Sequence, residues 1–503
     1  MAKGSRHRSR WLLAAVFCTG CWALMCVTLL RFHVDTHSDR AHGMRTRESG
    51  PRFRRVATFA THAASGLATV ETSSGLIYLA VANYYSAASP IFAIDASTSN
   101  PRSSVRVERV QTVRTSAAHD ITLVEGLNGR TQLVIANYVG DTSVVLQLRA
   151  GGASTEQVID LQCFDAHTEC SSWAQGGECQ KNRGFMEAEC AASCGCSGEG
   201  TPFAIVQHVP TRGACAVHHI PVQSLTSAGQ ARHLLAVANA HDGVNSASIL
   251  EWHEATRTWR PWITLPVEGA SEFAHTVLPN GELVLAVASW FAQGTFVTRS
   301  RLFTFRTDGS GFDLMGEVVT RGAHDVEFFT AHVAPSVVRT GLIIANVRDD
   351  ATQFVPSLVL ELNLSHGTSI VQEVPSLGAH DVHVVQAGDR RLVLVANQGD
   401  GSSCNATVDM HEVVPGLLRL QHIGELTRAT DGCAVYVHSF KSSRSGRLFV
   451  AVAIEKTDRD RKVLVEQAGG STHDLSLSTK AYADTDDSGS AFRTDSLLFE
   501  WKE

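Results

Sequence analysis

The sequence predicts an all-β fold, a seven-bladed β-propeller, because one pattern of short apolar runs recurs along most of the chain. The run LIYLAVAN ends at Asn83 and is followed by a short polar turn. Equivalent runs end at six further positions: Asn137, Asn239, Ser289, Asn346, Asn397 and Ile454. Most neighbouring copies lie some 50–57 residues apart, and one interval is about twice as long. Seven copies predict seven blades.

Each copy belongs to a unit of four short extended runs. In one unit GAHDVEFF (322–329) precedes the copy and PSLVLEL (356–362) follows it. These runs are rich in β-branched and aromatic residues and show no helical period, which is typical of strands separated by turns. Four strands repeated at this spacing indicate a propeller, in which each blade buries its two faces against its neighbours.

The two ends of the chain predict how the ring closes. The last copy ends with its third strand, SLLFEWKE (496–503), while FRRVATF (53–59) stands before the first copy without a unit of its own. We expect this N-terminal strand to complete the last blade, since an unpaired edge would otherwise remain. The propeller therefore spans 53–162 and 197–503, interrupted by one insertion at 163–196. A second, polar insertion at 457–490 predicts a mobile loop.

The length of the chain bears on its architecture, and its net charge bears on its partner. A chain of 503 residues is too long for one ordinary core unless that core is a repeat array. The net charge of −7 argues against a nucleic-acid partner, which would need a clustered basic surface.

The N-terminus predicts a membrane anchor. Residues 11–30 are about twenty apolar residues, enough to span a bilayer, and a basic tail (1–10) precedes them. We expect a single-pass type II protein of the secretory pathway or cell surface, with a stem at 31–52. The alternative is a long cleaved signal and a secreted protein.

Cysteines and sequons favour the same compartment. Six of the twelve cysteines crowd residues 163–196, which suits disulfides in an oxidising lumen. Asn363 and Asn405 each begin an N-x-[S/T] triplet and are candidate glycosylation sites.

The repeated motif residues have a structural interpretation. Asn tolerates left-handed backbone and can bond its own backbone, so one Asn per blade predicts a turn cap. Three His-Asp pairs begin inner strands, where we expect the Asp to accept from nearby amides: His119-Asp120, His324-Asp325 and His380-Asp381. The alternative is that the histidines converge on the central axis and bind a transition metal.

The ordered combination of GAHDVEFF, an apolar run ending in VAN, and S-x-I/L-x-x-W resembles the epilepsy-associated (EAR, or EPTP) repeat. The resemblance covers about 53 to 503 apart from insertions. Copies four and seven depart from it, with Ser289 and Ile454 at the Asn position and no His-Asp pair. It implies a propeller that binds extracellular or cell-surface proteins without catalysis. It also implies a calcium ion in the channel, for which Asp120, Asp325 and Asp381 are the candidates by position.

The insertion at 163–196 resembles a ShK-toxin-like (ShKT) domain through C-x-D, W-A-x-x-G-E-C and C-x-x-x-C-G. So short a segment cannot build a sufficient core and needs disulfides. Spacing alone allows fifteen connectivities. The resemblance implies Cys163–Cys196, Cys170–Cys190 and Cys179–Cys194. The lysine with which the sea-anemone toxin plugs channels is absent, so we expect an interaction or spacer module.

The sequence motifs favour binding over catalysis. The sequence lacks the common zinc-protease, serine-hydrolase and nucleotide motifs, so the predicted function is a membrane-anchored, non-catalytic protein-binding propeller. The alternatives are a carbohydrate-active enzyme, whose acidic pair would come from Asp120, Asp325, Asp381 and Glu327, and a structural surface or matrix protein. The partner is an extracellular or cell-surface protein, or a glycan. Tyr84 and Tyr85, which no other copy shares as a pair, are the predicted contact surface.

Overall fold

The structure is a computed structural model, and the residues that it describes all belong to the compact unit Ser49–Glu503. They are 52–96, 105–149, 167–182, 201–222, 231–240, 246–334, 337–363, 367–400, 407–455 and 493–502, together with Met186, Cys190, Ser193, Cys194 and Cys404. The predicted tail, anchor and stem therefore lie outside the described residues, as do Asn405 and the insertion at 457–490. Within the described residues, no helix is long and apolar enough to cross a membrane.

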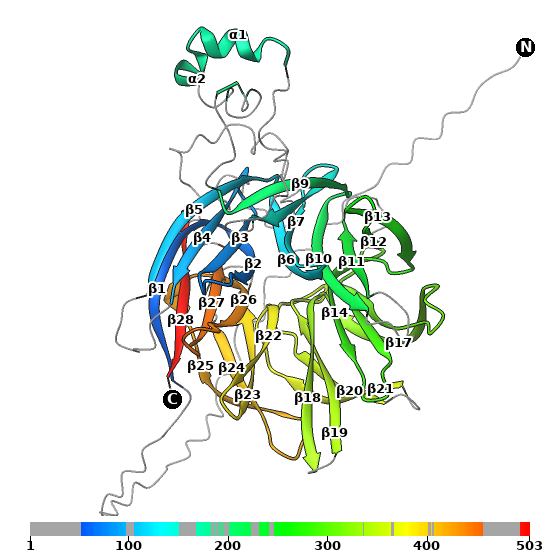
Figure 1. The fold of residues 1–503 in the computed structure, drawn as a ribbon. Coiled ribbons are helices and arrows are strands. Elements are labelled where there is room, and N and C mark those ends of the chain that lie inside the picture. Colours follow the sequence, from blue (N-terminus) through cyan, green and yellow to red (C-terminus); the bar gives the residue numbers. More distant parts are fainter. Residues whose placement is uncertain are drawn as a thin grey trace, which may run out of the picture. The chain divides into compact units, whose positions relative to one another are not determined.

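The propeller in the described part of this unit consists of seven antiparallel four-stranded sheets, as the sequence predicts (Figure 1). The first strands, one per blade, are β2 (Ala64–Glu71), β6 (Ala118–Leu127), β10 (Ala214–Val222), β14 (Ala270–Val277), β18 (Ala323–Ala334), β22 (Ala379–Ala387) and β26 (Ala434–Lys441). Each first strand contacts the first strands of the two neighbouring blades, and β26 contacts β2. These inner strands therefore form a closed ring.

The other strands follow outward in chain order. The second strands are β3 (Ile77–Asn83), β7 (Arg130–Asn137), β11 (Arg232–Asn239), β15 (Leu283–Ser289), β19 (Val337–Asn346), β23 (Arg390–Asn397) and β27 (Leu448–Ile454). The third are β4 (Ala88–Asp95), β8 (Thr142–Leu148), β12 (Ser246–His253), β16 (Val297–Phe305), β20 (Ser357–Asn363), β24 (Val408–Val413) and β28 (Arg493–Lys502). The outer are β5 (Arg106–Arg114), β9 (Phe203–Pro210), β13 (Thr258–Leu265), β17 (Phe312–Arg321), β21 (Gly367–Val374), β25 (Leu420–Glu425) and β1 (Arg52–His62).

The predicted closure is confirmed, because β1 pairs with β28 and becomes the outer strand of the seventh blade. Phe53 lies opposite Trp501, and their rings contact edge to face at 5.0 Å. Thr61, which is fully buried, meets the hydroxyls of Thr494 and Ser496 at 2.9 and 3.0 Å. The two ends of the propeller thus hold one sheet together.

The cores lie between neighbouring blades. One cluster joins Leu79 and Phe92 of the first blade to Phe449 and Leu498 of the seventh. Both faces of each sheet are covered, so the second strands read as continuous apolar runs; every residue of β15 is buried. This explains why these runs show no alternation of apolar and polar residues.

The recurring Asn caps a turn, but not through the predicted left-handed backbone. Asn83 accepts from the amide of His62 at 3.2 Å and donates to the carbonyl of Ala88 at 3.0 Å. The corresponding amide-to-Oδ1 bonds are made by Asn137, Asn239, Asn346 and Asn397. The left-handed conformation falls instead on the residue before each inner strand in the first six blades: Ala63, Ala117, Gly213, Gly269, Gly322 and Gly378. The Asn side chain therefore links the start of the inner strand to the turn after the second strand.

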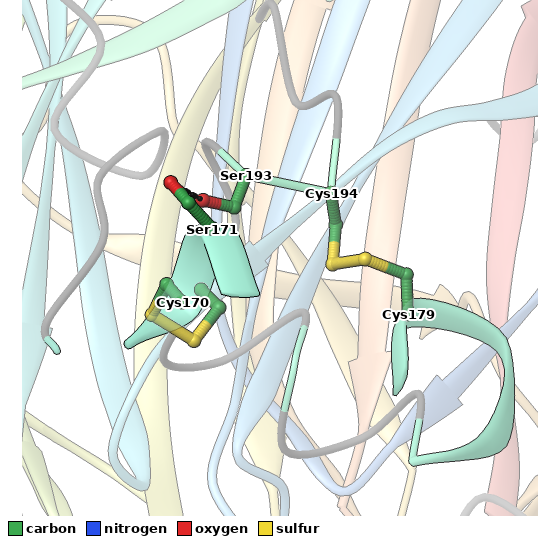
Figure 2. Close-up of a disulfide and its surroundings, with 6 residues drawn as sticks. Cys170, Ser171, Cys179, Ser193 and Cys194 are labelled. Atoms are coloured by element: carbon green, nitrogen blue, oxygen red, sulfur yellow. Dashed lines mark hydrogen bonds between the residues drawn. A yellow bond between two sulfur atoms is a disulfide. The ribbon is translucent and has the colours of Figure 1, made fainter. Parts of the chain in front are cut away.

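The cysteine module is inserted between β8 and β9, two strands of the second blade, as predicted. It contains α1 (Cys170–Gln175) and α2 (Glu178–Lys181). Figure 2 shows the disulfide between Cys179, which is a residue of α2, and Cys194. Together with Cys170–Cys190, it confirms two of the three pairings that the resemblance implies. Cys163 and Cys196, the third pair, lie outside the described residues.

One further disulfide lies in the propeller. Cys404 pairs with Cys433, which precedes the inner strand of the seventh blade. The spacing of these two cysteines in the sequence does not reveal this pairing. The three disulfides among the described residues indicate a protein of the extracellular space or the secretory pathway.

Candidate binding channel

Every inner strand begins with a β-bulge, and the bulge brings two successive side chains to the centre of the ring. The register shifts between the first and third residue of each inner strand in all seven blades. Such bulges re-aim side chains and are common beside functional sites. We call the bulged residue position 2 and the next one position 3. The His-Asp pairs of the sequence occupy these two positions.

Position 3 forms a layer of carboxyl groups. A cavity of about 160 Å³, which we call the carboxyl cavity, is lined by Asp120, Glu272, Asp325, Asp381 and Tyr436 from five blades. The three aspartates that the sequence singled out therefore meet. Glu272 and Tyr436 were missed, because copies four and seven lack a His-Asp pair. Aligning GASEF (269–273) with GAHDV (322–326) would have placed Glu272 here.

The aspartates hold neighbouring blades together. Oδ2 of Asp120 accepts from the amide of Val217 at 2.9 Å. Asp325 accepts in the same way from Val382, and Asp381 from Val437, at 2.8 and 2.7 Å. The expectation that Asp bonds nearby amides is confirmed, with the donor always on the next blade.

The second oxygens of these carboxyl groups are satisfied less evenly. Asp325 and Asp381 are hydrogen-bonded to each other, which requires one of them to carry a proton. Oδ1 of Asp120 is buried and has no hydrogen-bond partner among the described residues. A buried oxygen without a donor is costly, so the cavity has an unused site for a cation or a proton.

Burial and mutual repulsion raise the pKa of the whole layer. Desolvation raises the pKa of Asp325 to about 7 and that of Asp120 to about 6. Desolvation and the charge of Asp325 raise the pKa of Asp381 well above its ordinary value. Glu272 shifts in the same direction, through desolvation and the charges of Asp120 and Asp325. The layer is therefore partly protonated at neutral pH.

A second layer of titratable groups lies two residues further along the inner strands. Glu327 accepts from the amide of Val384 at 2.7 Å and faces Nδ1 of His383 at 3.4 Å. Burial lowers the pKa of His383, but the charge of Glu327 outweighs it, so the pKa rises. Desolvation and His383 lower the pKa of His438 to about 3. Glu327, a predicted member of an acidic pair, thus pairs with a histidine.

The predicted aromatic pair lies at the position 2 end of the channel. Tyr84 contacts Tyr85 at 4.9 Å, His119 at 5.3 Å and Tyr138 at 5.6 Å between ring centroids. Trp290, which follows β15 of the fourth blade, contacts His324 at 5.5 Å between ring centroids. Both tyrosines are half-buried. We call this group the aromatic mouth: Tyr84, Tyr85, Tyr138 and Trp290.

Three further features of the sequence concern glycosylation, metal binding and a cysteine. Asn363 ends β20 and is exposed, as a glycosylation acceptor must be. Among the described residues, no group of three or more His, Cys, Asp or Glu side chains is already arranged around a metal position. Cys215, at position 2 of the third blade, forms no disulfide with another cysteine of the described residues.

Comparison with known proteins identifies the inserted module. Residues 162–196 match the family model described as ShK domain-like. No curated protein matches the chain.

Solved structures that match differ widely in origin. They include a protein from Lactobacillus plantarum (12% identity, TM-score 0.41, covering 73% of this chain and 86% of that chain). Sqt1 of Saccharomyces cerevisiae is 9% identical, with a TM-score of 0.42 and coverage of 89% and 99%. Exo-β-1,3-galactanase of Phanerochaete chrysosporium is 11% identical, with a TM-score of 0.32 and coverage of 49% and 57%. At these values the likenesses carry no argument about function.

Proposed function

We propose that this chain is a non-catalytic, protein-binding propeller of the EAR/EPTP type, held at the cell surface or in the secretory pathway by residues 11–30. The observation that carries the proposal is the aromatic mouth. Half-buried tyrosine and tryptophan rings, gathered from several blades on a rigid ring, are typical of the centres of protein-binding surfaces. The partner is an extracellular or cell-surface protein.

The carboxyl cavity supports binding more than catalysis. Its volume of about 160 Å³ is small beside the roughly 300–1,000 Å³ of usual small-molecule sites. The three aspartates are at most 8% exposed, and each is tied to the backbone of the next blade. A carbohydrate-active enzyme stays the second candidate, because a carboxyl group with a pKa near neutrality suits acid–base work.

The carboxyl cavity also supports the calcium ion that the resemblance implies. Calcium takes oxygen ligands from carboxylates, and Oδ1 of Asp120 is buried without a hydrogen-bond partner in the described part of the chain. Asp120, Asp325 and Asp381 would hold the ion, with Glu272 as a fourth carboxylate. Since the carboxyl groups are partly protonated, binding would release protons. Calcium should therefore bind more tightly at pH 8 than at pH 6, which calorimetric titration at the two pH values would measure. Repeating one titration in two buffers of different ionisation enthalpy would measure the number of protons released.

The experiment that tests the binding function is proximity labelling around the full chain on expressing cells, with and without calcium. We expect enrichment of one or a few surface proteins, lost in the double variant Tyr84→Ala/Tyr85→Ala. Leu314→Ala is the control, since Leu314 is an exposed apolar residue on the outer strand β17. Recovery of no surface or matrix protein, together with turnover of a glycan that Asp325→Asn abolishes, would favour the enzyme instead.

A further inference from the structure

Another cavity lies in the fourth blade, where copy four of the repeat has Ser289 instead of Asn. Its volume is about 360 Å³, and β15, β16, β17 and two turns contribute to its lining, which includes Glu268, Ser289, Gln293, Arg299, Arg301 and Glu317. We call it the blade-four cavity. We propose that it binds a carboxylated sugar, either as a free sugar acid or as the end of a glycan.

The departure from the repeat explains why the cavity is open. In the first, second, fifth and sixth blades, the Asn side chain donates to a carbonyl at the start of the third strand, that of Ala88, Thr142, Pro356 or Thr407. The shorter side chain of Ser289 donates instead to the carbonyl of Glu268. The space that an Asn amide would fill therefore belongs to the cavity. Its buried wall is formed by Ser289 and Thr298, which are 1% and 5% exposed.

The lining is hydrophilic, which indicates the kind of ligand. Apart from Ala292 and Val297, every side chain that lines the cavity carries a polar group. Most small-molecule sites are predominantly apolar, so this lining disfavours lipids and aromatic ligands, although the volume lies within the usual range of about 300–1,000 Å³. Sugar hydroxyls donate to carboxylates and accept from amide and guanidinium groups, and the cavity offers all three kinds of partner.

The arrangement of charge adds a carboxylate to the ligand. Oε1 of Glu317 accepts from Nε of Arg301 at 2.8 Å, and Oε2 lies 3.5 Å from Nη1 of Arg299. In the part of the chain that the structure describes, Glu317 is the acidic partner of both arginines, so one positive charge is left over on this side. Guanidinium groups bind carboxylates through two parallel hydrogen bonds. The carboxylate of the sugar should therefore lie at Arg299, whose side chain is 63% exposed.

The other side of the cavity suits the hydroxyl groups. Nε2 of Gln293 donates to Oε2 of Glu268 at 2.8 Å. Both residues are exposed at the opening, so a ligand can reach them from solvent. The second oxygen of the Glu268 carboxylate can accept from a hydroxyl, and the amide oxygen of Gln293 can do the same.

The blade-four cavity is a site of its own. Within the described ranges it shares no lining residue with the carboxyl cavity. Trp290, which begins the turn at 290–296, belongs to the aromatic mouth, whereas Gln293 and Thr295 of the same turn line the blade-four cavity. Sugar binding here does not depend on a protein partner at the mouth, and the two functions can be tested separately.

The experiment is calorimetric titration of the full chain, purified in detergent, with small sugars. The probes are the methyl glycosides of glucuronic acid and of sialic acid, the two free acids, methyl glucoside as the neutral match, and acetate as a carboxylate without hydroxyls. We expect saturable binding of at least one acidic sugar, and binding of methyl glucoside and acetate about 10-fold weaker or less. Binding of a methyl glycoside would support the end of a glycan as the ligand, and binding of a free acid alone would support a soluble sugar acid.

Three variants locate the site. Arg299→Gln removes the guanidinium proposed to bind the carboxylate and should weaken binding about 10-fold or more. Ser289→Asn introduces the side chain of the other copies, should fill the buried wall and should abolish binding. Arg339→Gln is the matched control, since Arg339 on β19 is also an exposed arginine paired with a glutamate, Glu361, and should leave binding unchanged.

Thermal unfolding shows that each variant is folded. The proposal is overturned if the folded wild-type chain binds none of the acidic sugars saturably, or if methyl glucoside binds as tightly as the glucuronic acid glycoside and the sialic acid glycoside. It is also overturned if Arg299→Gln and Ser289→Asn both bind as wild type does. None of these results depends on whether proximity labelling recovers a protein partner, so the failure of one proposal leaves the other standing.

Discussion

Replacing Asp325 by Asn tests the proton held in the carboxyl cavity. The amide has almost the shape of a carboxyl group, its oxygen can still accept from the amide of Val382, and its nitrogen can donate to Asp381. What the variant loses is the charge that Asp325 acquires on ionisation. The two proteins should therefore differ least where Asp325 is protonated and most where it is ionised.

The magnitude follows from the pKa. Asp325 has a pKa of about 7 in the fold against an ordinary value of 3.8. One pKa unit is 1.36 kcal/mol, so ionisation inside the fold costs about 4 kcal/mol. A raised pKa contributes stability below pH 3.8 that is lost as pH rises through 7, because the folded state binds more protons than the unfolded state. We expect Asp325→Asn to match wild type near pH 4 and to exceed it by about 2–4 kcal/mol at pH 8, allowing for coupling to Asp381.

The assay is urea unfolding at pH steps from 4 to 8, with a chelator present, and the measured quantity is the difference in unfolding free energy between the two proteins. Histidines with lowered pKa give wild-type stability the opposite slope, but they are common to both proteins and cancel in the difference. Leu314→Ala, at an exposed residue of the outer strand β17, is the control; it removes no titratable group and should give a flat difference. A flat difference for Asp325→Asn would refute the raised pKa and, with it, the shared proton.

Three other predictions concern the turns and the disulfide of the propeller around the channel. Each is tested by urea unfolding. Gly378 and Gly388 both have a φ of 63°, but only at Gly378 would a Cβ meet a backbone oxygen, that of Gly399 at 2.5 Å. Gly388→Ala should cost about 1 kcal/mol and Gly378→Ala clearly more, and equal costs would show that the close approach is unimportant. Asn346→Ala removes an accepted and a donated hydrogen bond at a buried position and should cost about 2–4 kcal/mol; a cost below 1 kcal/mol would contradict the bridging role. Cys404→Ser should cost about 3–4 kcal/mol, from the entropy of a loop of 29 residues, and a reducing agent should abolish the difference.

The sequence was enough to predict the blades, their number and their closure, since these depend on local pattern. An apolar run that ends in a polar turn marks a strand wherever it occurs, and the spare strand at 53–59 could complete only one blade. The prediction of a left-handed backbone conformation at Asn83 was wrong. That conformation lies at Ala63, twenty positions earlier, and the hydrogen bond from the amide of His62 to Asn83 joins the two regions. The conformational propensities of neighbouring residues cannot predict a hydrogen bond between segments so far apart in the sequence.

The channel was predictable only in part. The position of Asp120, Asp325 and Asp381 in equivalent repeats already implied a common layer, because blades are related by rotation around one axis. Glu272 and Tyr436 were hidden, since their repeats replace both residues of the motif. The partnering of Asp325 with Asp381, and of His383 with Glu327, depends on which blades are neighbours and on how far each side chain reaches, and a pattern does not contain these distances.

The two kinds of titratable group in the channel have pKa values shifted in opposite directions, and the reason is shared. Burial penalises any charge, so it raises the pKa of Asp325 and lowers that of His324, and at neutral pH much of the channel is uncharged. A neutral lining costs the fold less than a charged one would, yet the carboxyl groups stay able to ionise. A calcium ion bound in the carboxyl cavity would stabilise their charged form and displace protons. Calcium binding should therefore release protons near pH 7, and calorimetry in two buffers of different ionisation enthalpy measures this release; binding without proton release would contradict a partly protonated carboxyl layer.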